Sequence, residues 1–550
     1  EQTPNTKYVF PNGEVSQAAK IVVPAELGMF DQKDTKNKTQ EIEYKIFDSL
    51  ANGFSYMFQM TNKAFAYDIT TGNLITAKRG FHDVLKSKWQ FYEGDNTLYN
   101  IFARTSPDNG YTWDEAIPLY IRAEEDLADA RYPSCYGFDL EGSLAIAYTF
   151  PTLNYVPGAG SEWWGFLTGM HMTEDDSRYS YENFDDVELE NVDLKWNTDS
   201  RILAGVKAGT TDEYYIVAVS ELSLRPEDEQ MYEESSNIGI RRTENLFDDE
   251  WTEEVPDAWR STLFTNVGTV GSRINQMVAL KKNADDDMFL AVYGNFLANR
   301  EGLAEYQNRY GVSKSSDYGA TWADYEVVPP SVFSNYAVAQ GWADGDLYTN
   351  NYNTRDFVVL DNGDYSFMTQ IVLSDGMENS DGRIVEIYRE SGEWGIRDIA
   401  GYLPNMVYED YKDAEENRDN PSDIELQAAR TVDGSAIIAK WVSIEGYDPD
   451  AGTFQYTDVH VAFRKTNSNK WEEPINVTDD EFIDRTTFIP DYVPNDLKRI
   501  PLMSMIGWIE NDPDTGEEWT EREAQFRTMN DQYLRIGHFD AIVGIEDETH

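Results

Sequence analysis

The chain has 550 residues, of which 41% are hydrophobic and 13% aromatic, which is enough for a large core. Its 100 acidic residues outnumber its 45 Lys and Arg residues, so the net charge of −55 argues against general binding of nucleic acid or of anionic membranes. A single cysteine, Cys135, excludes a disulfide within the chain, and no stretch reaches the roughly 20 apolar residues of a membrane span.

The N-terminal region, residues 1–44, opens with EQTPNTKYVF. This resembles the start of a mature protein whose signal peptide has been removed, so we expect an exported protein. The segment YVFPNGEVSQAAKIVVP has the residue pattern of a strand. We expect it to add a closing strand to the last sheet of the molecule.

Short β-type runs follow along the rest of the chain, among them SLAIAYTF, YYIVAVS, MFLAVYG and AIIAKWVS. They are rich in Tyr, Phe, Val and Ile, and turn-forming pairs of Gly, Asn, Asp and Pro separate them. Long amphipathic helical stretches are scarce. The sequence therefore predicts an all-β protein.

The pattern Ser-x-Asp-x-Gly-x-x-Trp occurs twice in the chain. The two copies are Ser106, Asp108, Gly110 and Trp113, and Ser315, Asp317, Gly319 and Trp322. In a tight hairpin, Ser and Asp side chains bond to nearby backbone, Gly takes a positive φ, and Trp folds back beneath the turn. Two such copies indicate a repeated structural unit.

Two sets of residues recur with a common period of about 70 residues. The first set consists of the aromatic residues that end each predicted hairpin: Trp113, Phe184, Trp251, Trp322, Trp394 and Trp471. The second set consists of arginines expected just before the first strand of each unit: Arg131, Arg201, Arg273, Arg355 and Arg499. One member of the second set is absent and would fall near Gln427.

The period divides the chain into seven units. They run near residues 45–122, 123–192, 193–260, 261–332, 333–402, 403–480 and 481–545, and residues 546–550 form a tail. Seven four-stranded sheets of this kind predict a seven-bladed β-propeller, a fold that leaves only short sheet edges exposed.

The two turns resemble the Asp boxes of the sialidase-like (BNR-repeat) propeller superfamily. The resemblance implies the propeller fold, and the superfamily includes sialidases, other glycosidases, polysaccharide lyases and non-catalytic surface proteins. Sialidases carry an Arg-Ile-Pro motif ahead of their Asp boxes, whereas Arg499-Ile500-Pro501 follows both boxes here. Since no Tyr–Glu nucleophile pair can be placed by spacing, the sequence gives little support for sialidase activity.

The C-terminal residues, GHFDAIVGIEDETH, are similar to the linker that precedes the sorting domain of proteins exported by the Bacteroidetes type IX secretion system. This resemblance covers about ten residues. It implies a secreted or cell-surface location.

The arginine set is the first candidate site. If the first strand of each blade lines a central channel, these arginines converge at its mouth, where guanidinium groups can bind carboxylate or sulfate. The polar residues that could join them are Tyr132, Asn275, Asn353 and Asp356. The alternative is that each arginine pairs with a neighbouring acid and holds blades together, and both interpretations stay open.

Acidic turns are the second candidate. They contain pairs of aspartates two residues apart: Asp344 and Asp346, Asp448 and Asp450, and Asp512 and Asp514. Calcium takes six to eight oxygen ligands, so such turns could bind Ca²⁺. The alternative is an exposed turn stabilised by its own side chains. No nucleotide-binding or other organic-cofactor motif is present.

Trp163 and Trp164 are the third candidate, because they lie in the Gly-rich segment GAGSEWWGF, which we expect to be a loop. Exposed tryptophans can serve as a platform for sugar rings or for a protein partner, and the alternative is packing inside a blade.

Three function classes follow from these candidate sites. They are a non-catalytic module that binds a glycan or a surface protein, a glycosidase or lyase acting on an anionic polysaccharide, and a structural subunit of an extracellular layer or filament.

Overall fold

The computed structural model describes the strands and many of their connections. The described residues are 7–9, 15–17, 42–50, 64–79, 100–121, 128–156, 160–174, 179–184, 186–189, 192–224, 237–245, 250–260, 277–297, 306–341, 347–349, 355–373, 381–402, 424–445, 456–478, 487–507 and 532–541. Among them no helix has the length and apolar character needed to span a membrane.

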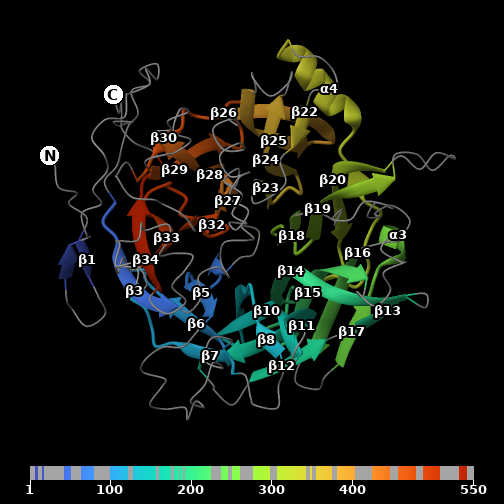
Figure 1. The fold of residues 1–550 in the computed structure, drawn as a ribbon, viewed down its shortest axis with the longest axis vertical. Coiled ribbons are helices and arrows are strands. Elements are labelled where there is room, and N and C mark those ends of the chain that lie inside the picture. The colour runs from blue at the N-terminus through green and yellow to red at the C-terminus, as the bar shows by residue number, and fades with distance from the viewer. Residues whose placement is uncertain are drawn as a thin grey trace. The chain divides into compact units, whose positions relative to one another are not determined.

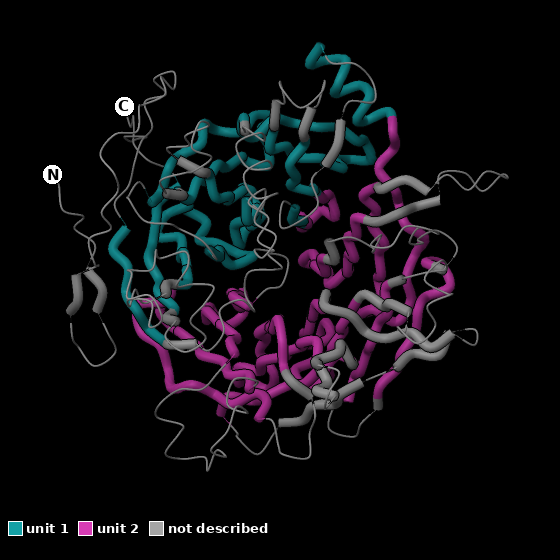
Figure 2. Tube along the Cα trace, in the orientation of Figure 1, with its two compact units in different colours: residues 1–60, 331–358, 366–550 teal, residues 61–330, 359–365 magenta. Residues whose placement is uncertain are grey.

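The described chain is almost entirely β-structure (Figure 1). It forms seven sheets of four or five strands, together with one separate pair of short strands. The all-β, seven-bladed β-propeller fold is thus confirmed. The strands fall into two compact units, coloured separately in Figure 2.

Unit 2 comprises residues 61–330 and 359–365 and contains four of the sheets. The first has β4 (Phe65–Tyr67), β5 (Leu74–Arg79), β6 (Ile101–Ser106) and β7 (Ile117–Tyr120). The second has β8 (Ala128–Ala130), β9 (Ser134–Leu140), β10 (Ser143–Val156), β11 (Gly160–Met172) and β12 (Tyr179–Phe184). The third has β13 (Asp186–Leu189), β14 (Val192–Val206), β15 (Tyr214–Leu224), β16 (Asn237–Asn245) and β17 (Glu250–Glu254), followed by helix α3 (Asp257–Arg260). The fourth has β18 (Met277–Lys282), β19 (Met288–Leu297), β20 (Tyr306–Ser315) and β21 (Glu326–Val327).

Unit 1 comprises residues 1–60, 331–358 and 366–550 and contains the other three sheets. After helix α4 (Pro330–Ala339), one sheet has β22 (Leu347–Thr349), β23 (Arg355–Val359), β24 (Tyr365–Leu373), β25 (Asp381–Glu390) and β26 (Glu393–Tyr402). The next has β27 (Gln427–Thr431), β28 (Ala436–Glu445), β29 (Tyr456–Lys465) and β30 (Ile475–Asn476), with β32 (Tyr492–Val493) parallel to β27. The last has β31 (Thr487–Phe488), β33 (Ile500–Gly507), β34 (Gln532–Phe539) and β3 (Lys45–Leu50).

The strand that completes the last sheet differs from the predicted one. Strand β3 pairs with β34, with Lys45 opposite Ile536. The predicted closing segment instead holds β1 (Lys7–Val9) and β2 (Val15–Gln17), which pair with each other. The first predicted unit, 45–122, therefore begins one strand too early. Both segments have strand character, and only the long-range pairing distinguishes them.

Strand β15 shows why the β-type runs are apolar on both faces. Alternate residues of a strand point to opposite faces. Tyr214, Ile216 and Ala218 join one hydrophobic cluster with residues of β9, β10 and β11. Tyr215 and Val217, on the other face, join a second cluster with residues of β18 and β19. The sheet of β15 is thus packed between two neighbours within unit 2, which requires apolar side chains on both of its faces.

Candidate functional site

Arg131 lies just before β9, and Arg201 lies within β14 of the neighbouring sheet in unit 2. The tips of the same two sheets are joined by a backbone hydrogen bond of 3.0 Å from Glu141 N to Thr211 O. Residues 141 and 211 are 70 positions apart, as are 131 and 201. β9 and β14 each lead to one of these tips, with Arg131 three residues before the start of β9 and Arg201 five residues before the end of β14.

The environments of the two arginines differ. Arg131 is half-buried, and its backbone N–H donates to Pro151 O at 3.0 Å. Arg201 is only 3% exposed, and its Nη1 donates to Ser200 O at 2.7 Å. Of the pair, Arg131 has the side chain that solvent, and hence a ligand, can reach. Tyr132, the predicted neighbour, is buried and has a positive φ of 35°, which is uncommon for a residue with a Cβ.

In unit 1, Arg355 and Asp356 lie at the start of β23 and are both fully buried. Asp356 accepts two backbone hydrogen bonds of 2.8 Å, one at Oδ1 from Phe357 N and one at Oδ2 from Ala428 N. The second bond joins residues 72 positions apart in neighbouring sheets. It places Gln427 at the height of Arg355, which is where the absent member of the arginine set was expected. Asp356 therefore links two sheets.

Arg499 does not have the predicted position. Arg499 directly precedes β33. Strand β31 of the same sheet and strand β32 of the neighbouring sheet both come earlier in the chain, so β33 is not the first strand of its sheet. Gln427 Oε1 accepts a hydrogen bond of 2.9 Å from Ile489 N, so the matching position of the last unit lies near residue 489. Arg499 is exposed in a turn, with a φ of 50° and its backbone N–H donating to Asp540 Oδ1 at 2.8 Å. The part of the chain that runs from β27 to β31 is shorter than the corresponding part of the preceding unit. For this reason Arg499 lies beyond the first strand of its sheet.

Several predicted site residues lie outside the described residues. They are Arg273, Asn275, Asn353, Asp344, Asp346, Asp448, Asp450, Asp512 and Asp514. Within the described ranges, no group of three or more His, Cys, Asp or Glu side chains could hold a metal ion. Calcium at the acidic turns stays a prediction.

Trp163 and Trp164 lie within strand β11, so the prediction of a loop at this segment is wrong. Thr152 of β10 pairs with Gly165, whereas Leu153 pairs with Trp163. Trp164 is therefore the extra residue of a β-bulge. The Gly-rich stretch that suggested a loop supplies the start of the strand instead.

The two Ser-x-Asp turns share one set of local contacts. In the first, Ser106 Oγ accepts from Gly110 N at 2.7 Å, and Asp108 Oδ1 accepts from Thr112 N at 2.7 Å. In the second, Ser315 Oγ accepts from Gly319 N at 3.0 Å, and Asp317 Oδ1 accepts from Thr321 N at 2.8 Å. The indole N–H of each tryptophan donates to the glycine carbonyl of its own turn. These side chains are thus engaged within the turns themselves.

A second set of arginines, which the sequence did not lead us to expect, lies in strands β6, β16 and β29 of three sheets. Arg104, Arg241 and Arg464 each stand two residues before the Ser or Thr that opens the next turn, and all are buried. Arg104 Nη1 donates to Asp114 O at 3.0 Å, and Arg241 Nη2 pairs with Glu253 Oε1 at 2.6 Å. The signal available in the sequence was the repeated Arg-x-Ser/Thr in ARTS, RRT and RKT.

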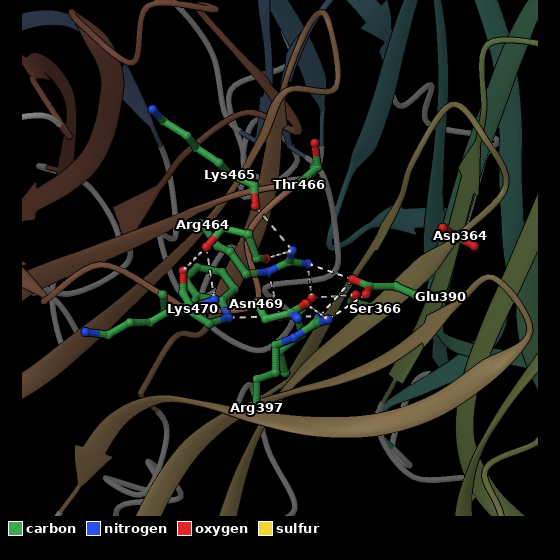
Figure 3. A network of polar contacts seen from close by, with 12 residues as sticks. Asp364, Ser366, Glu390, Arg397, Arg464, Lys465, Thr466, Asn469 and Lys470 are labelled. Carbon is green, nitrogen blue, oxygen red and sulfur yellow. Dashed lines mark hydrogen bonds and ion pairs between the residues drawn. The ribbon is translucent and has the colours of Figure 1, made fainter.

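Arg464 belongs to a polar network of unit 1 (Figure 3). Its Nε and Nη2 contact Glu386 Oε2 and Oε1 at 3.0 and 2.6 Å. Glu386 also accepts hydrogen bonds from Ser366 Oγ at 2.8 Å, Trp471 Nε1 at 2.9 Å and Arg397 Nη1 at 3.4 Å. Because Glu386 is fully buried and both its oxygens are occupied, it acts as a link between β25 and β29.

Glu390 extends this network toward solvent. Arg397 holds its carboxylate with two contacts of 2.7 and 2.5 Å, and Arg464 adds one of 3.1 Å. Burial alone would raise the pKa of Glu390, but the hydrogen bonds and charges of Arg397 and Arg464 outweigh it and lower that pKa. Arg464 thus follows the alternative interpretation of the arginines, in which a guanidinium holds sheets together.

Neither a family model nor a curated protein matches the sequence. Among solved structures, the chain is similar to the polysaccharide lyase Uly1, with a TM-score of 0.41, 10% identity, and coverage of 85% of this chain and 88% of that one. It is also similar to a protein of unknown function from Dyadobacter fermentans, with a TM-score of 0.38, 10% identity, and coverage of 77% and 99%. A third is the NanB sialidase from Streptococcus pneumoniae, with a TM-score of 0.37, 11% identity, and coverage of 90% and 70%. The propeller fold of this chain rests on its own seven sheets.

Proposed function

We propose that the chain is a secreted or cell-surface propeller protein that binds an anionic glycan without cleaving it, with Arg131 as a ligand-contacting residue. The observation that carries this proposal is the half-buried side chain of Arg131, just before β9 of unit 2 and one repeat of 70 residues ahead of the buried Arg201 in the neighbouring sheet. A guanidinium has five N–H donors in a planar fork that matches the geometry of a carboxylate or sulfate, and its stem can pack against protein.

Charge supports the same conclusion. In a protein with a net charge of −55, an accessible arginine such as Arg131 is a local positive charge on a strongly negative surface. An anionic group is attracted to such a charge and repelled by the surrounding surface. A neutral sugar gains nothing from it, so discrimination between acidic and neutral glycans is the property to measure.

The test compares Arg131→Ala with the wild type on an array of carboxylated, sulfated and neutral glycans. We expect retention on one acidic class to fall at least tenfold, because a charge-assisted contact is worth about 1.5–3 kcal/mol. Lys207→Ala is the matched control, since it removes one positive charge at the far end of β14, where Lys207 pairs with Glu244. Equal retention by the wild type and Arg131→Ala would exclude the site.

Cleavage is tested separately by incubating the retained polysaccharide with the protein and measuring new reducing ends and unsaturated products. No product is expected. Product formation that disappears in Arg131→Ala would show instead that the same site belongs to a glycosidase or lyase. Circular dichroism of each variant confirms that the fold is retained.

A further inference from the structure

Gln370 is a polar side chain in the interior of unit 1 whose hydrogen bonds are unaccounted for. It lies in β24 and is fully buried. Neither its Nε2 nor its Oε1 has a hydrogen-bond partner among the residues that the structure describes. A buried amide without partners destabilises a protein relative to an apolar side chain of the same shape, and nearly all such groups bond to protein or to ordered water.

The direction of Gln370 follows from its strand. Ser366, four residues earlier in β24, donates to Glu386, which pairs with Arg464 of the next sheet. Alternate residues of a strand share a face, so Gln370 points the same way as Ser366. Its amide therefore faces the sheet that contains β27, β28 and β29.

The residues opposite Gln370 can be located from the spacing of known contacts. Asp356 to Ala428 and Arg397 to Asn469 are contacts between these two sheets, and each joins residues 72 positions apart. That spacing sets Gln370 opposite residues 441–442 of β28. Of these, Val442 belongs to the cluster on the far face, so Trp441 is the side chain turned toward Gln370.

Trp441 and its neighbour His460 are both uncharged near pH 7. Trp441 is only 4% exposed, and its ring stacks on His460 with a centroid distance of 6.0 Å and an interplanar angle of 18°. Burial lowers the pKa of His460 to about 4, so its imidazole is neutral near pH 7. A charged ligand would find no counter-ion in the indole, the neutral imidazole or the amide.

We propose that an ordered water molecule is bound at the Gln370 amide, between β24 and Trp441 of β28. Water supplies both a donor and an acceptor and carries no charge, and buried polar groups that lack a protein partner commonly bond to such waters. The site would make Gln370 part of the contact between two sheets. Glu386 has the same role nearby, since it links β25 to Arg464 of β29.

The test is a crystal structure of the full chain at a resolution that places waters, together with urea unfolding of Gln370→Met. We expect density for a water within hydrogen-bond distance of the amide, and a folding equilibrium constant about tenfold lower in Gln370→Met. Met368→Leu is the matched control, because Met368 is fully buried on the same face of β24 and has no polar hydrogen.

Two results would overturn the proposal. One is a well-ordered Gln370 amide with no water beside it. The other is a Gln370→Met protein at least as stable as the wild type, since removing an amide that has no partner should stabilise the fold. A loss of stability equal to that of Met368→Leu would count against the site as well.

Discussion

The turns at 106–113 and 315–322 have the same motif and the same local hydrogen bonds, but they differ in what they contact. Trp113 is half-buried, whereas Trp322 is 8% exposed and meets Trp259 edge-on at a centroid distance of 5.4 Å. The second turn is also held by Arg242, whose Nε donates to Tyr318 O at 2.8 Å. The motif thus determines the shape of the turn, and the neighbouring sheet determines how much stability the turn contributes.

Removing the tryptophans should separate the two turns most strongly. Trp322→Ala is expected to lower the free energy of unfolding by about 3–5 kcal/mol, because it leaves a cavity in a cluster that includes Trp259. Trp113→Ala should cost roughly 1–2 kcal/mol, because less of its surface is buried. Urea unfolding of both variants measures the difference. Equal losses would show that the turn motif, and not its docking, sets the stability.

Substituting the glycines should give a smaller difference. Gly110 and Gly319 have φ angles of 91° and 81°, so alanine at either position should cost about 1–2 kcal/mol. At Gly319 an added Cβ would also lie 2.7 Å from Val217 Cγ2, which should add roughly 1–3 kcal/mol. In a Val217→Ala background that addition should shrink, whereas Gly110→Ala should be unaffected. A Gly319→Ala cost that is independent of Val217 would contradict the close contact.

The aspartates should give the smallest difference, and it depends on pH. Burial would raise the pKa of Asp317, but hydrogen bonds from Thr321 and Ser315 and the charge of Arg242 lower it overall. At Asp108, bonds from Thr112 and Ser106 likewise outweigh burial and lower the pKa. A carboxyl group whose pKa is lowered by folding stabilises the protein above its unfolded pKa of about 4, and this contribution is lost as the pH falls through the folded value.

Asparagine substitutions measure this contribution. Asp317→Asn and Asp108→Asn should both destabilise the protein at pH 7 and have less effect near pH 3. Adding Arg242→Ala should reduce the cost of Asp317→Asn at pH 7 and leave that of Asp108→Asn unchanged. If Arg242→Ala altered both costs alike, Arg242 would be acting on the whole fold and not on Asp317.

The blade pattern could be predicted because it depends on local chemistry. Ser, Asp, Gly and Trp within eight residues are sufficient to define each turn, and apolar runs such as YYIVAVS match strands that are buried on both faces. The period also placed Gln427 correctly at the height of Arg355. These features need no information about distant parts of the chain.

The candidate site could be predicted only in part. The spacing of about 70 residues applies to Arg131 and Arg201, but it fails at Arg499, because the connection after β27 is shorter. Arg464 was overlooked because its partner, Glu386, is 78 residues away, and a charged residue in a strand is more often exposed than buried. Whether Arg131 contacts a ligand remains the prediction that the glycan array tests.

The sequence by itself determined the all-β class, the repeat and the geometry of the two turns, because hydrogen bonds over a few residues and alternation along a strand are encoded locally. Only the tertiary structure decided that β3, and not the segment before it, pairs with β34. It likewise decided which arginines are buried in ion pairs and that Asp356 serves as a link between sheets. The physical reason is that these outcomes depend on which partners the fold brings within hydrogen-bond distance, and such partners lie from about 70 to almost 500 residues apart in this chain.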